Sequence, residues 1–529
     1  MCLQYVRAAF AVSLLIFGMK CISLVRKQTL LQLAPPEMDG SSRPECLPST
    51  RQAVLREIID WATDPTREEN ILWYHGLAGS GKSTISTTIA TTFRDLHRLG
   101  AFIFFDRKYP ERSHPSKVIR ALAYKLGSFD PRIGVAICTA IEDFPGINDS
   151  SLEVQFTKLI LEPLTSITEL TAEGPIVLVF DALDECGDPT DREALLNIFA
   201  TKFSRLPSTI RVLITSRQLD DINCLDGHQN IISRNSEVSS DDGDILTYFQ
   251  CQFAAIRKKA RLTSEWPGDE VIQDLGKRSQ GLFVWASTVV KFINSYDPPA
   301  HLATILNGGS AAGPMAALDD LYRRALDQAG PWDDDNFVDH FHTILETILV
   351  LQNPLATSTL DGLIGSLGSR SSSDAVAVLA CVIASEPTVH LLHPSFADFL
   401  FTRERCGKDM WHFKAADCHR HLLLRCLNRL SNDGLKRNIC NLTLSVDLDG
   451  ETVPDDIAYA CLFWIDHLCS IGDDYLPLSG DLEAFLNKHF LHWFEVMSIL
   501  GKSKDTIRLL GKLRRCIMVS FICQFETTN

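Results

Sequence analysis

The sequence has no C-x-x-C pair, and its 16 cysteines have no histidine partners at zinc-finger spacing. Neither a structural zinc site nor a disulfide framework is therefore indicated, and we expect reduced, mostly buried thiols. Long low-complexity tracts are also lacking, since apolar residues make up 45% and charged residues 22% of the chain. These values are typical of folded domains, and 529 residues exceed what one compact core holds, so several domains are expected.

An excess of basic charge is missing as well. The chain has 51 lysines and arginines against 66 aspartates and glutamates, a net charge of −15. This balance argues against a surface that holds nucleic acid nonspecifically, and we expect no nucleic-acid partner. No repeat period is found, which argues against a propeller or solenoid. The guanine-reading pattern Asn-Lys-x-Asp is absent too.

The N-terminus carries an apolar run, "AAFAVSLLIFGM" at residues 8–19, between basic residues. Its length suits a signal-peptide core better than a full membrane span, and the positive charges after it would leave the body of the protein in the cytosol. Two interpretations remain open. Residues 8–25 form a membrane anchor on a cytoplasmic protein, or they form a packed N-terminal helix or belong to a start site outside the mature domain.

The rest of the chain divides by composition and periodicity. Residues 34–51 are rich in Pro, Gly and Ser and predict a linker, with a domain boundary near residue 44. After residue 236 strand signals fade and apolar residues recur at helical spacing. The predicted parts are a leader and linker (1–43), an α/β domain (44–235), a helical domain (236–335), a small winged-helix-like domain (336–405) and a C-terminal helical region (406–529).

The α/β domain is predicted from short apolar runs that alternate with helical patterns. The runs that predict buried strands are "NILWYHG" (70–76), "GAFIFFDR" (100–107), "PIVLVFDALDE" (175–185) and "IRVLITSR" (210–217). Helical patterns such as "STISTTIATTFRDL" (83–96) separate them. This alternation predicts βαβ units and a mostly parallel sheet flanked by helices.

The stretch "GLAGSGKST" matches the phosphate-binding pattern G-x-x-x-x-G-K-[ST] and lies between a predicted strand and a predicted helix. Glycines let backbone N–H groups approach a phosphate chain, and the helix start adds a positive dipole end. Lys82 supplies a charge to the phosphates and the Ser83 hydroxyl a ligand to Mg²⁺. The alternative is a Gly-rich turn with an exposed lysine. The expected nucleotide contacts are Gly76, Gly79, Ser80, Gly81, Lys82, Ser83 and Thr84.

Acidic residues follow the strand predicted at residues 175–181. Five apolar residues lead into Asp181, and Asp184 and Glu185 come directly after it. Carboxylates at the carboxyl end of a buried strand face the crevice where ligands bind in open α/β sheets. Asp181 fits the Mg²⁺ side, while Glu185 or Asp184 fits the group that orients or deprotonates a water. The alternative is an acidic strand-to-loop turn without a ligand.

The strand predicted at residues 210–217 ends in Thr215, Ser216 and Arg217. If it neighbours the other strands, Arg217 could read the γ-phosphate, because a guanidinium distinguishes triphosphate from diphosphate. An arginine at a strand end is also a common solvated cap, and both interpretations stay open.

In this order, "HGLAGSGKST", "LVFDALDECGD" and "RVLITSR" resemble a fungal NACHT domain of the nephrocystin-like type, within the STAND class of signalling P-loop NTPases. The segments "ECLPSTRQAVLREIIDWA", "SQGLFVWASTVVKFI" and "VHLLHPSFADFL" resemble its lead-in, helical module and winged helix. The resemblance implies a latch in which ADP holds the nucleotide domain to the winged helix, and ATP frees it to oligomerise. His393 matches the family histidine that reaches the β-phosphate.

The resemblance implies a Mg²⁺-dependent ATP/ADP switch with slow hydrolysis, in fungal self/non-self or defence signalling. Its expected partners are the nucleotide, an upstream ligand, and copies of itself or related NACHT proteins. Such proteins commonly carry an N-terminal effector and a C-terminal repeat sensor, neither of which we recognise here. A truncated member, a regulator that co-assembles with longer relatives, and a product whose output the sequence does not reveal all stay open. Two alternatives stay open: a nucleotide-binding scaffold without turnover, and a membrane-tethered adaptor.

Overall fold

The computed structural model describes residues 25–527, except 34–37, 39, 41–42, 110–111, 169, 171–173, 237–242, 308–312, 366–371, 433, 441–452 and 473–477. Most of the predicted N-terminal apolar anchor, residues 8–24, thus lies outside the described residues. The chain divides into two compact units, Met1–Ala286 and Ser287–Asn529. The finer division into four domains after residue 44 stays a prediction.

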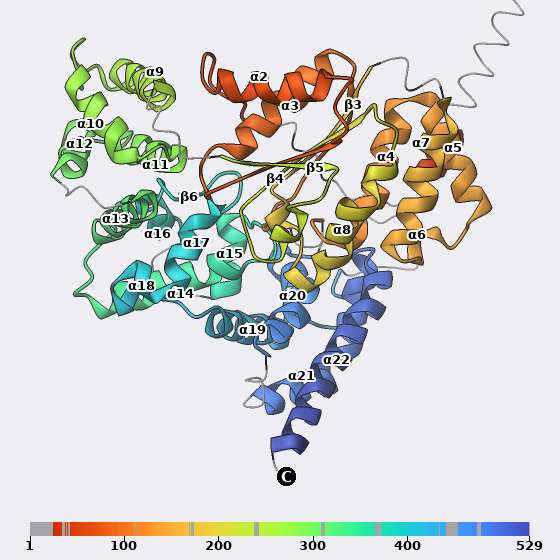
Figure 1. Cartoon of the computed structure of the whole chain (residues 1–529). Helices are drawn as coiled ribbons and strands as arrows, with labels where there is room; N and C mark the ends of the chain where they lie inside the picture. The colour runs from red at the N-terminus through yellow and green to blue at the C-terminus, as the bar shows by residue number, and fades with distance from the viewer. Residues whose placement is uncertain are drawn as a thin grey trace, which may run out of the picture. The chain divides into compact units, whose positions relative to one another are not determined.

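A five-stranded sheet forms the centre of the first unit (Figure 1). Its strands are β1 (Ile71–His75), β2 (Leu99–Phe104), β3 (Ile176–Asp181), β4 (Ile210–Ser216) and β5 (Ile231–Asn235). The strand order is β2-β3-β4-β1-β5 and every pair is parallel. The parallel α/β fold is confirmed, and the acids that end β3 lie beside the polar end of β4.

Two cores cover the two faces of this sheet. On β1, Ile71 and Trp73 join one core, while Leu72 and Tyr74 join the other. This alternation follows from the two-residue period of a strand, and both sets are apolar because helices cover both faces. The helices of this unit are α2 (Gln52–Thr63), α3 (Lys82–Asp95), α4 (Val118–Phe129), α5 (Pro131–Asp143), α6 (Leu152–Phe156), α7 (Glu162–Ser166), α8 (Pro189–Thr201), α9 (Gly243–Ala260), α10 (Asp269–Ser279) and the first turn of α11 (Phe283–Ile293), whose remaining residues belong to the second unit.

A short segment before the predicted domain boundary also belongs to the first unit. Leu30, Leu33 and Met38 are each at most 3% exposed and pack in the core that contains α4 and α5. The Met38 carbonyl accepts a hydrogen bond from the Phe104 N–H at 3.1 Å, beside the edge strand β2. The sequence predicts a linker over residues 34–51, whereas the structure places Met38 inside the core. Burial of its apolar side chains stabilises this segment in the core, although its Pro and Gly residues are typical of a linker.

The second unit is largely helical, which confirms the prediction for the region after the α/β domain. Its elements are α12 (Pro298–Leu306), α13 (Pro314–Asp327), α14 (Asp335–Val350), α15 (Thr357–Ile364), α16 (Ser372–Val378), β6 (Ile383–Ala384), β7 (His390–Leu391), α17 (Pro394–Phe401), α18 (Arg403–Cys406), α19 (Ala415–Ser431), α20 (Asp455–Ser470), α21 (Ser479–Ile499) and α22 (Ser503–Thr527). Strands β6 and β7 form an antiparallel pair. Among the described residues, no helix has the length and apolar character to cross a membrane.

Candidate functional site

The Gly-rich loop connects the carboxyl end of β1 to the first residue of α3. Gly76 and Gly79 have φ values of 153° and 79°, which side chains rarely adopt. A Cβ on Gly76 would lie 2.1 Å from the Ser236 hydroxyl, and one on Gly79 would lie 2.1 Å from a Val284 methyl. Both glycines are therefore required by backbone conformation and by close packing.

Lys82 starts α3 and is 9% exposed. Its ammonium group donates to the carbonyls of Gly76 at 2.9 Å and Leu77 at 2.8 Å, which holds the side chain over the loop. Burial lowers the pKa of Lys82 to about 8, although the nearby Asp184 opposes this shift. An anion beside the ammonium would raise this pKa again, because the opposite charge favours the protonated form. The alternative of an exposed lysine on a turn is excluded.

The hydroxyl residues around Lys82 differ in what they contact. Ser80 shares a hydrogen bond with the Ser236 hydroxyl at 3.1 Å, and the Thr84 hydroxyl donates to the Gly81 carbonyl at 2.8 Å. Both contacts fix the loop itself. Ser83 lies half-buried in the first turn of α3. We therefore keep Ser83 as the hydroxyl expected to reach a cation.

Asp181 ends β3 and is fully buried. Its Oδ1 accepts hydrogen bonds from the hydroxyls of Ser86 on α3 and Thr215 on β4. Its Oδ2 is buried and has no hydrogen-bond partner. A carboxylate oxygen in this state carries a large desolvation cost unless a cation or water contacts it. The residues therefore fit a hard divalent cation such as Mg²⁺, which prefers oxygen ligands.

The turn after β3 presents two more carboxylates. Ala182 takes a left-handed conformation with φ of 60°, and the short helical turn Leu183–Glu185 follows. Glu185 Oε2 accepts the Arg107 backbone N–H at 3.1 Å. Burial, and then the neighbouring charge of Asp184, raises the pKa of Glu185 to about 7. A carboxyl group with this pKa can accept a proton near neutral pH.

Asp184 is 5% exposed and contacts two arginines. The Arg217 Nε lies 3.1 Å from its Oδ2, and the Arg217 backbone N–H donates to its Oδ1 at 3.0 Å. The Arg107 guanidinium lies 3.7 Å from the same Oδ2. Asp184 is thus paired with cations, which favours a positioning role and leaves Glu185 as the better-placed proton acceptor. The solvated-cap interpretation of Arg217 does not fit, because its side chain is 18% exposed and ion-paired.

Lys82 connects these predicted residues into one site. Its charge interacts with Asp184, Arg217, Asp181 and Glu185. The residues come from the carboxyl ends of β3 and β4 and from the start of α3. The structure therefore brings together the loop lysine, the three acids and the arginine that the sequence singles out.

Two arginines of this region are missing from the sequence prediction. Arg107 follows β2 and contacts the acids as described above. Arg192 on α8 is 2% exposed, donates to the carbonyls of Asp184, Cys186 and Gly187, and pairs with the Asp221 carboxylate at 2.7 Å. It therefore ties the loop after β3 to the segment after β4. The sequence pattern could have indicated that Arg192 is buried. It lies on the apolar stripe of α8, three, four and seven residues before Leu195, Leu196 and Phe199.

His393 lies in the second unit, at the N-cap of α17. Its Nδ1 accepts the Ser395 N–H at 3.2 Å and shares a hydrogen bond with the Ser395 hydroxyl at 2.6 Å. The Ser395 hydroxyl also contacts the Tyr322 hydroxyl at 2.7 Å. This network fixes the orientation of the ring. The predicted contact of His393 with a phosphate stays a prediction.

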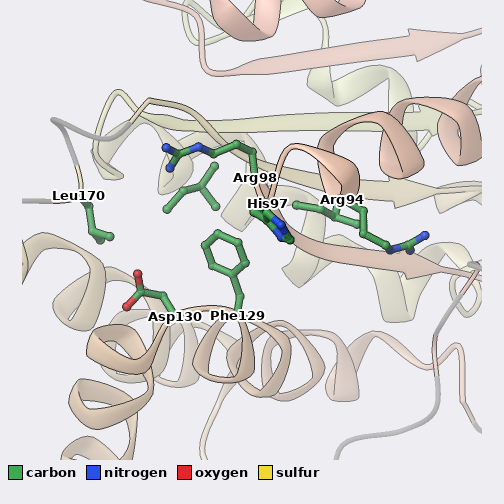
Figure 2. A pocket seen from close by; sticks show the side chains of 8 residues that line it. Arg94, His97, Arg98, Phe129, Asp130 and Leu170 are labelled. Atoms are coloured by element: carbon green, nitrogen blue, oxygen red, sulfur yellow. The ribbon is translucent and has the colours of Figure 1, made fainter.

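A hollow of about 320 Å³ lies at the opposite, amino edge of the sheet (Figure 2). Leu99 and Ile176, the first residues of β2 and β3, form part of it, together with Arg98 and Phe129. Figure 2 shows the Arg94 side chain extending away from Phe129 and Leu170. Because Asp181 and Glu185 lie at or after the carboxyl end of β3, this hollow is separate from the site around Lys82.

The chain is similar to a known protein family over the part that contains the carboxyl edge of the sheet. Residues 49–217 match the family described as Nephrocystin 3, N-terminal. The chain is 24% identical over 481 residues to the vegetative incompatibility protein HET-E-1 of Podospora anserina, a match that covers 84% of this chain and 34% of the relative. The chain thus spans about a third of that relative's length.

Two solved structures are similar at lower levels. A STAND protein with a tetratricopeptide repeat sensor from Pyrococcus horikoshii gives a TM-score of 0.47 at 12% identity, covering 91% of this chain and 56% of the other. Cdc6p from Pyrobaculum aerophilum gives 0.32 at 13% identity, covering 66% and 92%. Residues 49–217 thus carry a NACHT-type domain of the kind described as Nephrocystin 3, N-terminal, and the chain is a distant homologue of a fungal incompatibility protein.

Proposed function

We propose that this chain is an ATP/ADP-dependent signalling switch with slow, Mg²⁺-dependent ATP hydrolysis. One observation carries the proposal. A buried cation, Lys82, and a buried carboxylate with an unsatisfied oxygen, Asp181, meet at the carboxyl edge of one parallel sheet. Positive and negative groups of this kind fit the two halves of a metal–nucleotide complex, since phosphates need the cation and the metal needs the carboxylate.

Binding follows from the loop that precedes α3. Backbone N–H groups around Gly79 and Gly81, together with the positive end of the α3 dipole, would surround the phosphates. Lys82 would turn its ammonium from the loop carbonyls to the phosphate oxygens. Ser83 and Asp181 would hold Mg²⁺, which supplies charge neutralisation at the phosphates.

Hydrolysis would depend on Glu185. With a pKa of about 7, its carboxyl group can hold a water and take its proton near neutral pH. One of its oxygens is occupied by the Arg107 N–H, and Arg217 is paired with Asp184. We propose that these contacts must rearrange before Arg217 reads the γ-phosphate, which makes turnover slow or dependent on assembly.

The switch would couple the nucleotide to the helical part of the chain. Residues 336–405 contain three helices followed by the antiparallel strands β6 and β7, an element order that a winged helix requires. We propose that His393 contacts the β-phosphate of ADP from this part of the chain. A histidine in that position would make the angle between two domains depend on the bound nucleotide.

The signalling role is proposed from the relative, whose name is a vegetative incompatibility protein. We propose that the ATP-bound chain assembles with copies of itself or with related NACHT proteins in self/non-self signalling. Assembly is the measurable output of such a switch.

The experiment measures the molar mass of the full chain by light scattering with ADP, with Mg-ATP, or without nucleotide. Glu185→Gln is measured in parallel, because it should keep ATP bound. We expect larger assemblies for Glu185→Gln with Mg-ATP and a smaller species with ADP. The same molar mass in every nucleotide state would refute the switch.

A nucleotide-binding scaffold without turnover is the alternative that the paired state of Asp184 and Arg217 favours. The two functions predict different effects of Glu185→Gln on the rate of ATP hydrolysis. If wild-type chain and Glu185→Gln hydrolyse ATP at the same negligible rate while both bind it, the scaffold accounts for the site.

A further inference from the structure

Two cysteines of the second unit meet between α20 and α22. Cys469 lies one residue before the end of α20, Cys516 lies on α22, the two helices pack together, and the two thiols are close enough to interact. Both residues are half-buried and neither is in a disulfide. The two helices are therefore already close enough here for their thiols to interact.

An ion pair one turn away holds the helices in the same register. The Lys512 ammonium on α22 lies 2.5 Å from the Asp466 carboxylate on α20, with the lysine 38% and the aspartate 15% exposed. Asp466 precedes Cys469 by three residues, and Lys512 precedes Cys516 by four. Residues at these spacings lie on one helix face, so the ion pair and the thiol pair share one contact line.

The surroundings keep the Cys469 thiol protonated. Burial, and then the neighbouring Cys516 sulfur, raise the pKa of Cys469 to about 12, although Lys512 opposes the shift. Other cysteines in the described part of the second unit are more deeply buried, and burial raises the pKa of Cys418 and of Cys426 to about 12 as well. Partial exposure thus distinguishes Cys469 and Cys516 from these core thiols.

We propose that Cys469 and Cys516 form an oxidisable dithiol that closes to a disulfide between α20 and α22. The oxidant is a peroxide, or a small disulfide such as oxidised glutathione. This inference does not depend on the proposed nucleotide switch.

With hydrogen peroxide the step balances as follows. The Cys516 thiolate attacks one peroxide oxygen, the O–O bond breaks, and hydroxide leaves and is protonated to water. The Cys469 sulfur then attacks the sulfur of the Cys516 sulfenic acid, the S–O bond breaks, and the thiol proton of Cys469 passes to the departing hydroxide, which leaves as a second water. Two thiols lose two electrons and two protons in total, and one peroxide is reduced to two waters.

The disulfide would fix α22 to α20. α20 also packs against α15 and α19, so the cross-link would attach the last described helix to the interior of the second unit. A cross-link stabilises the folded state mainly by limiting the unfolded chain, provided that it fits the native geometry. We expect a higher unfolding temperature for the oxidised protein and slower hydrogen exchange in α22.

The experiment treats the reduced full chain with hydrogen peroxide, blocks remaining thiols with N-ethylmaleimide, and maps peptides by mass spectrometry without reduction. We expect one peptide pair linked through Cys469 and Cys516, and its loss in Cys516→Ser. Cys251→Ser is the matched control, because Cys251 is an exposed thiol on α9 of the first unit. This control should keep the linked pair.

Three outcomes decide the proposal. A linked pair in the wild-type chain, with a raised unfolding temperature that dithiothreitol reverses, supports it. Separate sulfinic or N-ethylmaleimide adducts on the two cysteines, without a linked pair, overturn it. So does a map in which Cys469 or Cys516 links mainly to other cysteines. The wild-type map decides the question even if Cys516→Ser fails to fold, and Cys469→Ser provides a second variant.

Discussion

The two edges of the central sheet both carry basic residues, but they are built differently. At the carboxyl edge, Lys82 is 9% exposed, Asp181 is fully buried, and Asp184 is ion-paired with Arg217. At the amino edge, Arg94 and His97 are exposed beside a hollow of about 320 Å³ (Figure 2). A hollow beside exposed basic side chains is therefore weak evidence for a nucleotide-binding site. Buried charges carry more information, because their desolvation is tolerated only where partners or a ligand compensate.

Replacing one basic side chain at each edge by alanine gives the largest expected difference, which is in the affinity for Mg-ATP. Lys82→Ala removes the buried ammonium at the carboxyl edge and should weaken Mg-ATP binding by about 1,000-fold, since a charge-assisted contact to phosphate is lost in a water-poor site. Arg98→Ala at the amino edge is the matched control and should change the affinity by less than about twofold. Isothermal titration of the full chain measures both. Equal losses in the two variants would mean that the edges do not differ in function.

A second prediction separates binding from chemistry within the carboxyl edge. Glu185→Gln should reduce ATP hydrolysis by about 100-fold, because the amide cannot accept the proton of the attacking water. The affinity for Mg-ATP should stay within about threefold, since the substitution preserves shape and the contact from the Arg107 N–H. Single-turnover assays with radiolabelled ATP measure the rate. Unchanged hydrolysis would remove Glu185 from the proposed chemistry.

A third prediction concerns the arginine that supports the carboxyl edge. Arg192→Met should lower the free energy of unfolding by about 2 kcal/mol, because three backbone carbonyls and the Asp221 carboxylate lose their donor. Arg234→Met is the control, since Arg234 forms an exposed ion pair with Glu57 and should cost less than about 0.5 kcal/mol. Urea unfolding measures both values. A loss for Arg192→Met no larger than the control would show that its contacts add little.

The smallest expected effect is a pH dependence of stability. The pKa of Glu185 is raised from 4.5 to about 7, so the folded chain holds a proton that the unfolded chain releases in this window. Glu185 therefore lowers the free energy of unfolding as pH rises from 4.5 to 7, and the cost is fully present above pH 7. Because the side chain is half-buried, we expect about 1 kcal/mol.

Glu185→Gln removes this cost and should gain stability over the wild-type chain between pH 5 and pH 8. Glu193→Gln, at an exposed position on α8, serves as control and should show no such gain. Parallel urea titrations at the two pH values provide the comparison. A gain that is independent of pH would contradict the raised pKa.

The sequence predicted the parts of the fold that apolar periodicity specifies. Strands β1 to β4 are buried on both faces, and their continuous apolar runs identified them. β5 was missed because it is an edge strand whose burial falls from Ile231 to the exposed Arg234 and Asn235. Met38 was missed because the Pro- and Gly-rich segment around it predicts a linker, while its contact with β2 depends on tertiary packing.

The candidate site was predictable where a motif fixes residue types at fixed spacing. Lys82 and Asp181 follow from such spacing and from the rule that parallel strands present their carboxyl ends at one edge. The pairing of Asp184 with Arg107 and Arg217 was not predictable, because it depends on the order of β2, β3 and β4 in the sheet. The position of Arg192 on the apolar stripe of α8 indicated that it is buried, but its partners, three backbone carbonyls and Asp221, could not be read from residue spacing. The dithiol between α20 and α22 likewise depends on helix packing.

The most direct test of the account is the nucleotide content of the full chain purified without added nucleotide, then denatured and chromatographed. We predict near-stoichiometric ADP in the wild-type chain and its loss in both Lys82→Ala and His393→Ala. Arg98→Ala should retain it. A wild-type chain that is empty and also fails to bind added Mg-ATP would contradict the central claim that the carboxyl edge of the sheet holds a nucleotide.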